Sequence, residues 1–490
     1  MGRVLTNTVT LTSAREAAGT PGTLPGSPIM NLLEPNSIGK FGPSLKKMAR
    51  LPISKNRMAR KPALVDLDST VDFELDLTYD HVREFVEALL FASSKGVATF
   101  AVTGVTSTGY TVASGGALPI RTLVVAKGLA IAGNNGLKVL VTGSTGTEIK
   151  TSGLTAEATA PSGATVEVAG IQGDTADIVM SASGHITTTA LNCTTLNLTA
   201  GQFIWVGGDG AATKFDVAAN RGLARVTAIA AGQISLDKRA GVFASDAGAG
   251  KTIQLFFSKY VRNVAVDHAD YIERTYMFEL AYENLAGGGV DEYEYASGNY
   301  CNEISFDFPL ATKAVMKCGF IGMTTGDPTT SRTSGFSTAL PPTSVEPVNT
   351  SSDLMRLRVT EADETGLTTD FKSMSISINN NVSPEKVLAY LGSKYINAGI
   401  IEIKITASVL FTDSDVIKKM RSNARVTMEV AWRNGDGGFV LDMPSMTIEN
   451  GDKQFPMNQS VTINMEAMCF QDATYNDVLS LSQFAYMPAS

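Results

Sequence analysis

The residues of this chain that could take part in catalysis or metal binding are few and do not combine into a recognisable site. Of the three histidines, only His268 lies in a cluster, Asp267-His268-Ala269-Asp270. A polar turn before a strand explains this cluster better than a metal site, because no partner lies at metal-ligand spacing. Residues 248–252 resemble the end of a phosphate loop, but Ser245 stands where that motif requires glycine. We therefore expect no enzyme activity, no metal and no cofactor.

The cysteines and the overall composition exclude further classes of protein. The four cysteines show no paired spacing, which favours buried thiols over a disulfide framework or a zinc site. No apolar run approaches the roughly 18 residues of a membrane span, and the N-terminus lacks the apolar stretch of a signal peptide. We expect a chain made in a reducing cytoplasm, without a membrane partner. A net charge of −8 gives no general signature of nucleic-acid binding.

Two groups of charged residues remain as candidates for a functional surface. Asp72, Glu74 and Asp76 alternate along one strand, so their side chains point to one side at intervals of roughly 7 Å. A solvated strand face, an acidic lining of a shared channel and paired catalytic carboxylates all fit this pattern. The second group is a stretch of residues 40–61 without acids, which could bind phosphates or, more in keeping with an acidic chain, dock on an acidic neighbouring subunit. The stretch begins at Lys40, and its further basic residues are Lys46, Lys47, Arg50, Lys55, Arg57, Arg60 and Lys61.

The elements that position these charges occur twice in the chain. Residues 71–77 alternate apolar and polar side chains as a half-buried strand does, and an amphipathic helix is predicted directly after them, up to residue 90. Residues 401–422 repeat this order of strand and helix, and a strand at 274–282 corresponds to one at 425–432. We expect a mainly β chain with two β-sandwich or barrel domains, each with a flanking α-helix.

A long segment of different composition interrupts the first of these domains. Between about residues 96 and 255 Gly, Ala, Thr and Val dominate, and the stretch that starts at Asn134 resembles the one that starts at Asn220. This pattern predicts small β-modules inserted into the first domain. The expected organisation is an N-terminal arm and stacking loop (1–62), the first domain (63–95 and 256–322), the inserted modules (96–255), a linker (323–369) and the second domain (370–490).

Several stretches carry a resemblance to a known family. Residues 32–91, 295–323 (beginning YASGNYCNEISFDFPL) and 373–413 resemble the major tail-tube proteins of long, flexible-tailed phages, and residues 109–140 are similar to modules found in such tails. The resemblance implies β-domains that form rings around a lumen, with the rings stacked into a tube through which double-stranded DNA passes. Most members carry one such domain and form hexameric rings. Two domains per chain therefore imply trimeric, pseudo-hexameric rings with the insert outside.

The resemblance also implies partners and roles. The partners would be further copies of the chain, a tape-measure protein and tail-end proteins, in the virion tail of a phage assembled in a bacterial cytoplasm. The basic stretch would be a ring-stacking arm, and the DNA would slide past an acidic lumen without sequence-specific binding. The acidic residues expected to face that lumen are Asp72, Glu74, Asp76, Glu402, Glu429 and Glu466.

An adhesin or spike that binds host-surface carbohydrate is the alternative. The Gly- and Thr-rich insert suits such a protein, and a sugar-binding surface would need exposed aromatic side chains. The insert supplies Tyr110, Phe203, Trp205, Phe215 and Phe243. A hydrolase would need a nucleophile beside a base, and no recognisable pair of this kind occurs in the sequence. The repeated strand–helix unit favours a ring over both.

Overall fold

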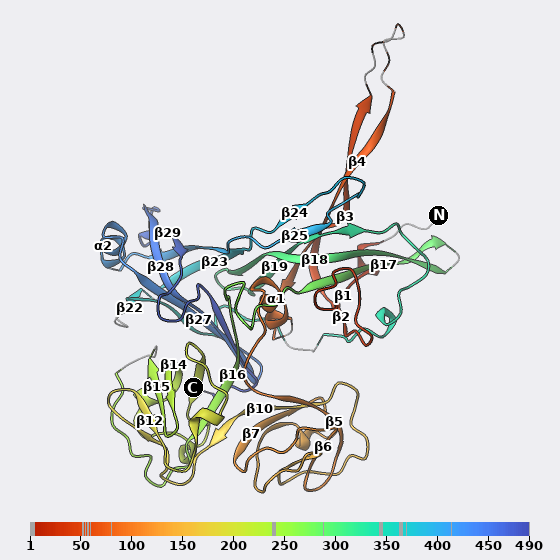
Figure 1. The fold of residues 1–490 in the computed structure, drawn as a ribbon. Coiled ribbons are helices and arrows are strands. Elements are labelled where there is room, and N and C mark those ends of the chain that lie inside the picture. Colours follow the sequence, from red (N-terminus) through yellow and green to blue (C-terminus); the bar gives the residue numbers. More distant parts are fainter. Residues whose placement is uncertain are drawn as a thin grey trace.

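Strands make up most of the chain. A computed structural model describes residues 5–50, 53, 55, 58, 60–79, 81–237, 242–287, 289–342, 346–361, 366–368, 370–412 and 414–489. Within this part of the chain there are two α-helices, α1 (Val82–Leu89) and α2 (Asp415–Arg421). The expected mainly β class is confirmed (Figure 1).

Six antiparallel strands, which we call the first strand set, come from both sides of the insert. β17 pairs with β1 and β18, β18 with β19, β19 with β4, and β4 with β3. A short strand, β2 (Met30–Leu33), pairs with the other edge of β1. In spatial order the set is β1 (Val9–Arg15), β17 (Thr275–Gly287), β18 (Val290–Phe308), β19 (Val315–Gly322), β4 (Arg60–Asp76) and β3 (Pro35–Arg50).

The C-terminal part of the chain forms a second strand set with the same order of pairing. β27 pairs with β21 and β28, β28 with β29, β29 with β26, and β26 with β23. The two sets are joined because β18 pairs antiparallel with β23. In spatial order the second set is β21 (Leu354–Glu361), β27 (Val426–Asn434), β28 (Gly437–Gln454), β29 (Thr462–Cys469), β26 (Glu402–Leu410) and β23 (Phe371–Asn379).

Shifts in pairing register occur at corresponding places in the two sets. The β18–β19 ladder shifts between Cys301 and Glu303, and the β28–β29 ladder shifts between Ile448 and Asn450. A second shift occurs at corresponding places in the β17–β18 and β27–β28 ladders, and a third occurs at corresponding places in the β3–β4 and β23–β26 ladders. Such bulges bend strands at defined positions, so both sets bend alike.

The apolar faces of both sets pack into one shared core. Val71, Phe73 and Leu75 of β4 are buried there because side chains two apart share a face of a strand. Helix α1 covers this side: Phe85 is fully buried, and its ring meets the ring of Phe73 at a centroid distance of 5.8 Å. The opposite side chains of β4, which are Thr70, Asp72, Glu74 and Asp76, face away from this core and are polar.

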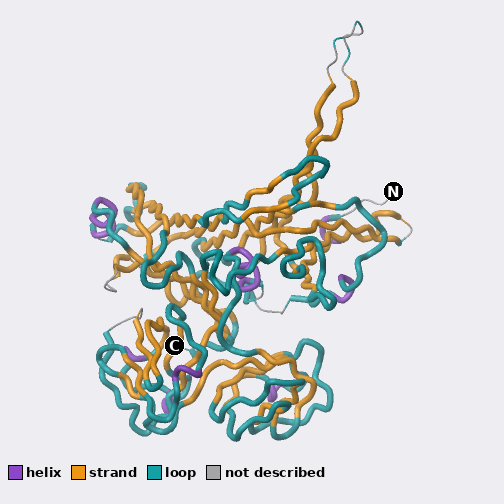
Figure 2. The backbone as a smooth tube through the Cα atoms, in the orientation of Figure 1, coloured by secondary structure: helices purple, strands orange, loops and turns teal. Residues whose placement is uncertain are grey.

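The insert folds into two small β-modules, which lie at the opposite end of the molecule from the β3–β4 hairpin (Figure 2). Each module has its own apolar core. The module strands are β5 (Thr99–Val105), β6 (Gly109–Val112), β7 (Thr122–Lys127), β8 (Gly136–Val139), β9 (Glu148–Lys150) and β10 (Thr165–Gln172), then β11 (Val179–Met180), β12 (His185–Thr187), β13 (Phe203–Val206), β14 (Gly222–Ala230) and β15 (Gln233–Asp237).

Strand β16 (Gln254–Arg262) fixes the modules to the second strand set. It pairs with β10 and β13 of the modules and then with β30 (Ser480–Phe484), which in turn pairs with β28. An apolar cluster shared by both modules, β28 and β30 fills the junction, with Phe203, Phe256 and Phe484 fully buried. The modules are therefore seated on the second set rather than tethered by a free linker.

Two expected segments have a different structure. Residues 1–62 are not an arm apart from the first domain, because β1 lies between β17 and β2, and β3 pairs with β4. Residues 323–369 are not simply a linker, since β21 is an integral strand of the second set. The remaining short strands are β20 (Thr324–Thr325), β22 (Gly366–Thr368), β24 (Ser383–Glu385) and β25 (Tyr395–Asn397).

Candidate functional site

The cluster around His268 and the stretch that resembles a phosphate loop both have structural roles. His268 Nδ1 accepts a hydrogen bond from the Asp270 backbone N–H at 3.1 Å, and Lys95 Nζ lies 2.6 Å from the Asp270 carboxylate, so this cluster is an ion-paired turn. Lys251, the lysine of the stretch that resembles a phosphate loop, forms an ion pair instead: its Nζ lies 2.9 Å from the Asp216 carboxylate. Among the described residues, no group of three or more His, Cys, Asp or Glu side chains could hold a metal ion.

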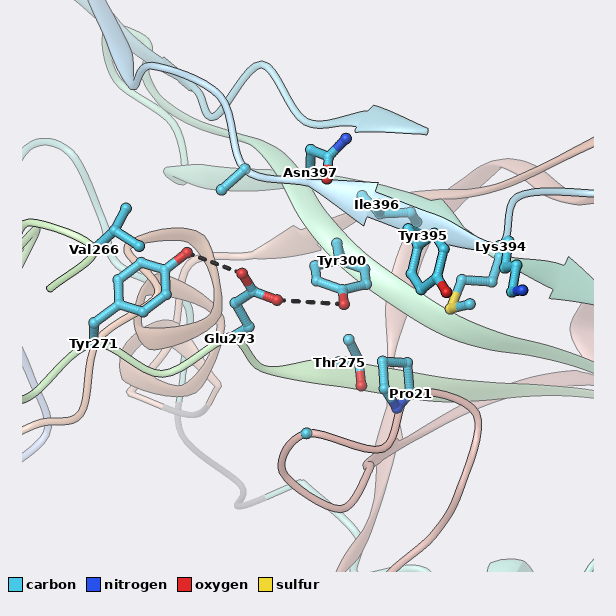
Figure 3. A pocket seen from close by; sticks show the side chains of 13 residues that line it. Pro21, Val266, Tyr271, Glu273, Thr275, Tyr300, Lys394, Tyr395, Ile396 and Asn397 are labelled. Atoms are coloured by element: carbon cyan, nitrogen blue, oxygen red, sulfur yellow. Dashed lines mark hydrogen bonds between the residues drawn. The ribbon is translucent and has the colours of Figure 1, made fainter. Parts of the chain in front are cut away.

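A hollow of about 600 Å³ lies between β17, β18 and β25 (Figure 3). Glu273 accepts hydrogen bonds there from the hydroxyls of Tyr271 at 3.0 Å and Tyr300 at 3.5 Å. Burial and the neighbouring Glu273 raise the pKa of Tyr300 to about 12, so this hydroxyl stays protonated at neutral pH. The residues that line this hollow include no histidine, cysteine or serine.

The most extensive candidate surface is the polar side of eight strands that pair in one continuous run, β3–β4–β19–β18–β23–β26–β29–β28. We call this side the polar face. Its acidic side chains outnumber its lysines. The acids are Asp72, Glu74, Asp76, Glu303, Asp307, Glu402, Asp452 and Glu466, and the lysines are Lys40, Lys317 and Lys404.

The acids of β4 are partly neutralised by cations. Lys317, directly opposite Glu74, lies 2.8 Å from Asp307 and 3.9 Å from Glu74, and its pKa is raised chiefly by the hydrogen bond to Asp307. Asp76 pairs with Lys313 at 2.6 Å. Partial burial raises the pKa of Asp72, and Lys40 opposes this effect. This end of the polar face therefore has mixed charge.

The other expected acids fall into two groups. Glu402 and Glu466 are exposed on the polar face, on neighbouring strands of the second set. Glu429 is not on that face, so the expectation that it shares one open surface with Glu402 and Glu466 is wrong. It lies in β27, is only 1% exposed and forms an ion pair with Arg356 at 2.5 Å. Glu279 in the first set is likewise buried and pairs with Arg332 at 2.6 Å.

Glu303, Asp307 and Asp452 belong to the polar face but were not among the expected residues. Glu303 and Asp307 alternate with the buried Ile304, Phe306 and Phe308 on β18, as the expected acids do, so this alternation was a usable signal. Asp452 lies between Gly451 and the exposed Lys453 and carries no such signal. The place of all three acids on one face with those of β4 depends on pairings between distant parts of the chain.

The basic residues lie on the outer half of the β3–β4 hairpin, which projects from the rest of the molecule (Figure 1). Lys46, Lys47, Arg50, Arg60 and Lys61 are exposed on its two strands, Lys55 is exposed between them, and Arg57 lies outside the described residues. Large apolar side chains are exposed among them: Leu45, Met48, Ile53, Met58, Leu64 and Val65.

The base of this hairpin is tied to the segment between β24 and β25. Lys386 Nζ lies 2.6 Å from Asp66 and also contacts Asp68. The hydrogen bond from Lys386 lowers the pKa of Asp66. Lys46 lies directly opposite Asp66 and also lowers its pKa, whereas residues 47–65, which carry most of the other cations of the hairpin, contain no acid.

A comparison with protein families identifies the class of protein to which this architecture belongs. The family model described as phage tail tube protein matches residues 224–467, which include β17–β19 of the first strand set and nearly all of the second. The chain belongs to the phage tail tube proteins.

This membership makes the chain a structural component of a virion tail, which assembles with itself and with other tail components. No curated protein sequence matches this tail tube protein. Within the part of the chain that the structure describes, no helix is both long enough and apolar enough to cross a membrane.

Proposed function

We propose that the two strand sets are two copies of one tail-tube domain, and that three chains form a ring of six such domains. Rings stack into the hollow tail tube of a long, flexible-tailed phage, and double-stranded DNA passes through the lumen. The observation that carries this proposal is the edge pairing of β18 with β23, which joins the two sets in one chain as neighbouring domains of a ring would be joined.

The number of six domains per ring is taken from the hexameric rings that the family resemblance implies. With two domains supplied by each chain, three chains fill such a ring. A ring formed in this way has no free sheet edge at its domain boundaries, which protects it from unregulated pairing with other chains.

The polar face is proposed to line the lumen. Its net negative charge repels DNA phosphates, so a passing duplex is not held. In Figure 1, α1 and the two modules lie on the same side of the β18–β19 region. Since α1 packs on the apolar side of these strands, the polar face is on the other side. We therefore place the modules on the outside of the tube.

The β3–β4 hairpin is proposed to contact the next ring. An exposed strand pair that carries apolar side chains such as Leu45, Met48 and Leu64 favours a protein partner, and its cations suit an acidic one. The tape-measure protein and the tail-end proteins are the further proposed partners.

The alternative of a carbohydrate-binding adhesin receives no support from the modules. Their five candidate aromatic residues are all buried, so they offer no exposed platform for stacking a sugar ring. These residues are Tyr110, Phe203, Trp205, Phe215 and Phe243.

Electron microscopy of the purified protein at high concentration tests the proposal. We expect hollow tubes of stacked rings, with three outer projections and six inner lobes in end-on averages. A chain that stays monomeric even with its tail-end proteins present refutes assembly into rings. Rings with six or more outer projections refute three chains per ring.

A second experiment tests stacking separately. Serine substitution of Lys46, Lys47, Arg50, Arg60 and Lys61 is expected to leave rings intact but to prevent long tubes. Serine substitution of Lys138, Lys150 and Lys214, three partly exposed lysines of the modules, serves as the control. Tubes of normal length from the hairpin variant refute the stacking role.

A further inference from the structure

Each strand set has one edge that the chain pairs and a corresponding edge that it leaves open. In the described structure, the outer half of β28 pairs only with β29, whereas the outer half of β18 pairs with both β19 and β23. Likewise β3 pairs only with β4, whereas β23 pairs with both β26 and β18. The open edges of β28 and β3 therefore correspond to the two strands that meet inside the chain.

The matching register shifts define which residues correspond. Asp307 at the end of β18 pairs with Val315, and Gln454 at the end of β28 pairs with Thr462, so Asp307 corresponds to Gln454. The shifts after Cys301 and Ile448 fall at the same distance from these residues, so the correspondence continues along both strands. Phe308 of β18 thus corresponds to Phe455, the residue that follows β28. By the same comparison, Phe41 of β3 corresponds to Ile376 of β23, and Ile38 to Met374.

Corresponding residues differ in exposure where a partner strand is present or absent. Phe308 is 3% exposed, but Phe455 is 75% exposed. Met374 and Ile376 are buried by β18, whereas Ile38 and Phe41 are only partly buried against the core. A partner that covers β28 and β3 as β18 and β23 cover each other would bury all of these side chains.

We propose that β28 of one chain pairs antiparallel with β3 of the next chain in the register of the β18–β23 ladder. Gln454 then lies opposite Lys40, Lys453 opposite Phe41, and Phe455 opposite Ile38. On the polar face this places Asp452 diagonally across from Lys40, an attractive cross-strand pair. The occupant of this edge is a second copy of the same chain, and the inference rests on the proposed ring.

Phe455 also gains an aromatic neighbour in this arrangement. Within the chain, the ring of Phe308 lies 5.9 Å from that of Trp432. Tyr282 is the residue of the first strand set that corresponds to Trp432, because it holds the same position in the β17–β18 ladder as Trp432 holds in the β27–β28 ladder. The next chain's Tyr282 therefore lies where Trp432 lies for Phe308, and Phe455 packs beside it.

Cysteine cross-linking tests the register. In K40C/Q454C, mild oxidation is expected to join neighbouring chains and give covalent dimers and trimers on non-reducing gels. The matched control is D307C/S375C, the corresponding pair within one chain, which is expected to form a bond without joining chains. The offset pair K40C/N450C, four residues out of register and so roughly 13 Å apart, is expected to stay unlinked. The native cysteines are buried and free.

The outcomes separate this inference from the proposed function. Rings seen by electron microscopy that resist cross-linking in K40C/Q454C, while the within-chain control closes, overturn the register but not the ring. Efficient cross-linking of the offset pair overturns it as well. Covalent products that continue beyond the trimer retain the strand pairing and overturn three chains per ring.

Discussion

Replacing Phe455 with serine should separate folding from assembly. Its ring is 75% exposed in the single chain, so its loss is expected to change the free energy of unfolding by no more than about 0.5 kcal/mol. In the assembled seam we expect Phe455 to be as buried as Phe308, at 3%. Burying a phenylalanine side chain in this way contributes about 2 kcal/mol.

This magnitude converts into a measurable loss of assembly. A loss of about 2 kcal/mol weakens each contact between chains about 30-fold. A ring of three has three such seams and loses about 6 kcal/mol if each contributes equally. We therefore expect F455S to melt at the wild-type temperature but to need a much higher protein concentration before sedimentation velocity detects rings.

Two further variants control this experiment. Met457 is 86% exposed, and the corresponding Leu310 is exposed as well, so M457S is expected to assemble like the wild type. F308S removes a buried ring and is expected to destabilise the folded chain by about 3–5 kcal/mol. An unchanged assembly threshold for F455S, or a fall in its melting temperature like that of F308S, would refute the reasoning.

Three more predictions concern charge. In E402K/E466K, tubes should form but phage infectivity should fall, because the lumen becomes attractive to phosphates; D267K, at an exposed site off the polar face, is the control, and equal infectivity would exclude an acidic lumen. R356M removes the cation that is paired with the buried Glu429 carboxylate and should cost about 3–5 kcal/mol in denaturant unfolding, whereas a loss below about 1 kcal/mol would contradict an essential ion pair. Burial raises the pKa of Asp477 to about 6, so its contribution to stability is lost as the pH rises through 6; D477N should raise the melting temperature at pH 7.5 and much less at pH 4.5, and equal shifts at both pH values would exclude this titration.

The sequence predicted those elements whose signals are local. The alternation of β4 followed by the amphipathic pattern of α1 needs only about 20 consecutive residues, and both elements form where they were expected. The likeness of the stretches at Asn134 and Asn220 also has a structural counterpart. Val125 pairs with Leu137 and Trp205 pairs with Leu223 in equivalent ladders.

The sequence analysis was wrong about the linker, the N-terminal arm and Glu429 for one physical reason, which is the burial of polar side chains. Arg356 on β21 and Glu429 on β27 form a buried ion pair, so β21 has the appearance of a linker and Glu429 that of a surface acid. In β1, Thr12 and Ser13 are fully or almost fully buried, yet small polar residues suggest an exposed arm. Sequence patterns assign polar residues to solvent and cannot identify partners that are distant in the chain.

The proposed ring has two kinds of seam, the β18–β23 pairing within a chain and the β28–β3 pairing between chains, and they differ because they form at different times. The seam within the chain forms during folding, and apolar residues such as Phe306 and Ile378 line it. The corresponding residues of the seam between chains are Lys453 and Pro43, which stay in water until a partner arrives. Lysine and proline on an open edge discourage premature strand pairing. In the proposed ring, each chain thus makes one permanent contact and keeps its other edge soluble, so that rings close only during tail assembly.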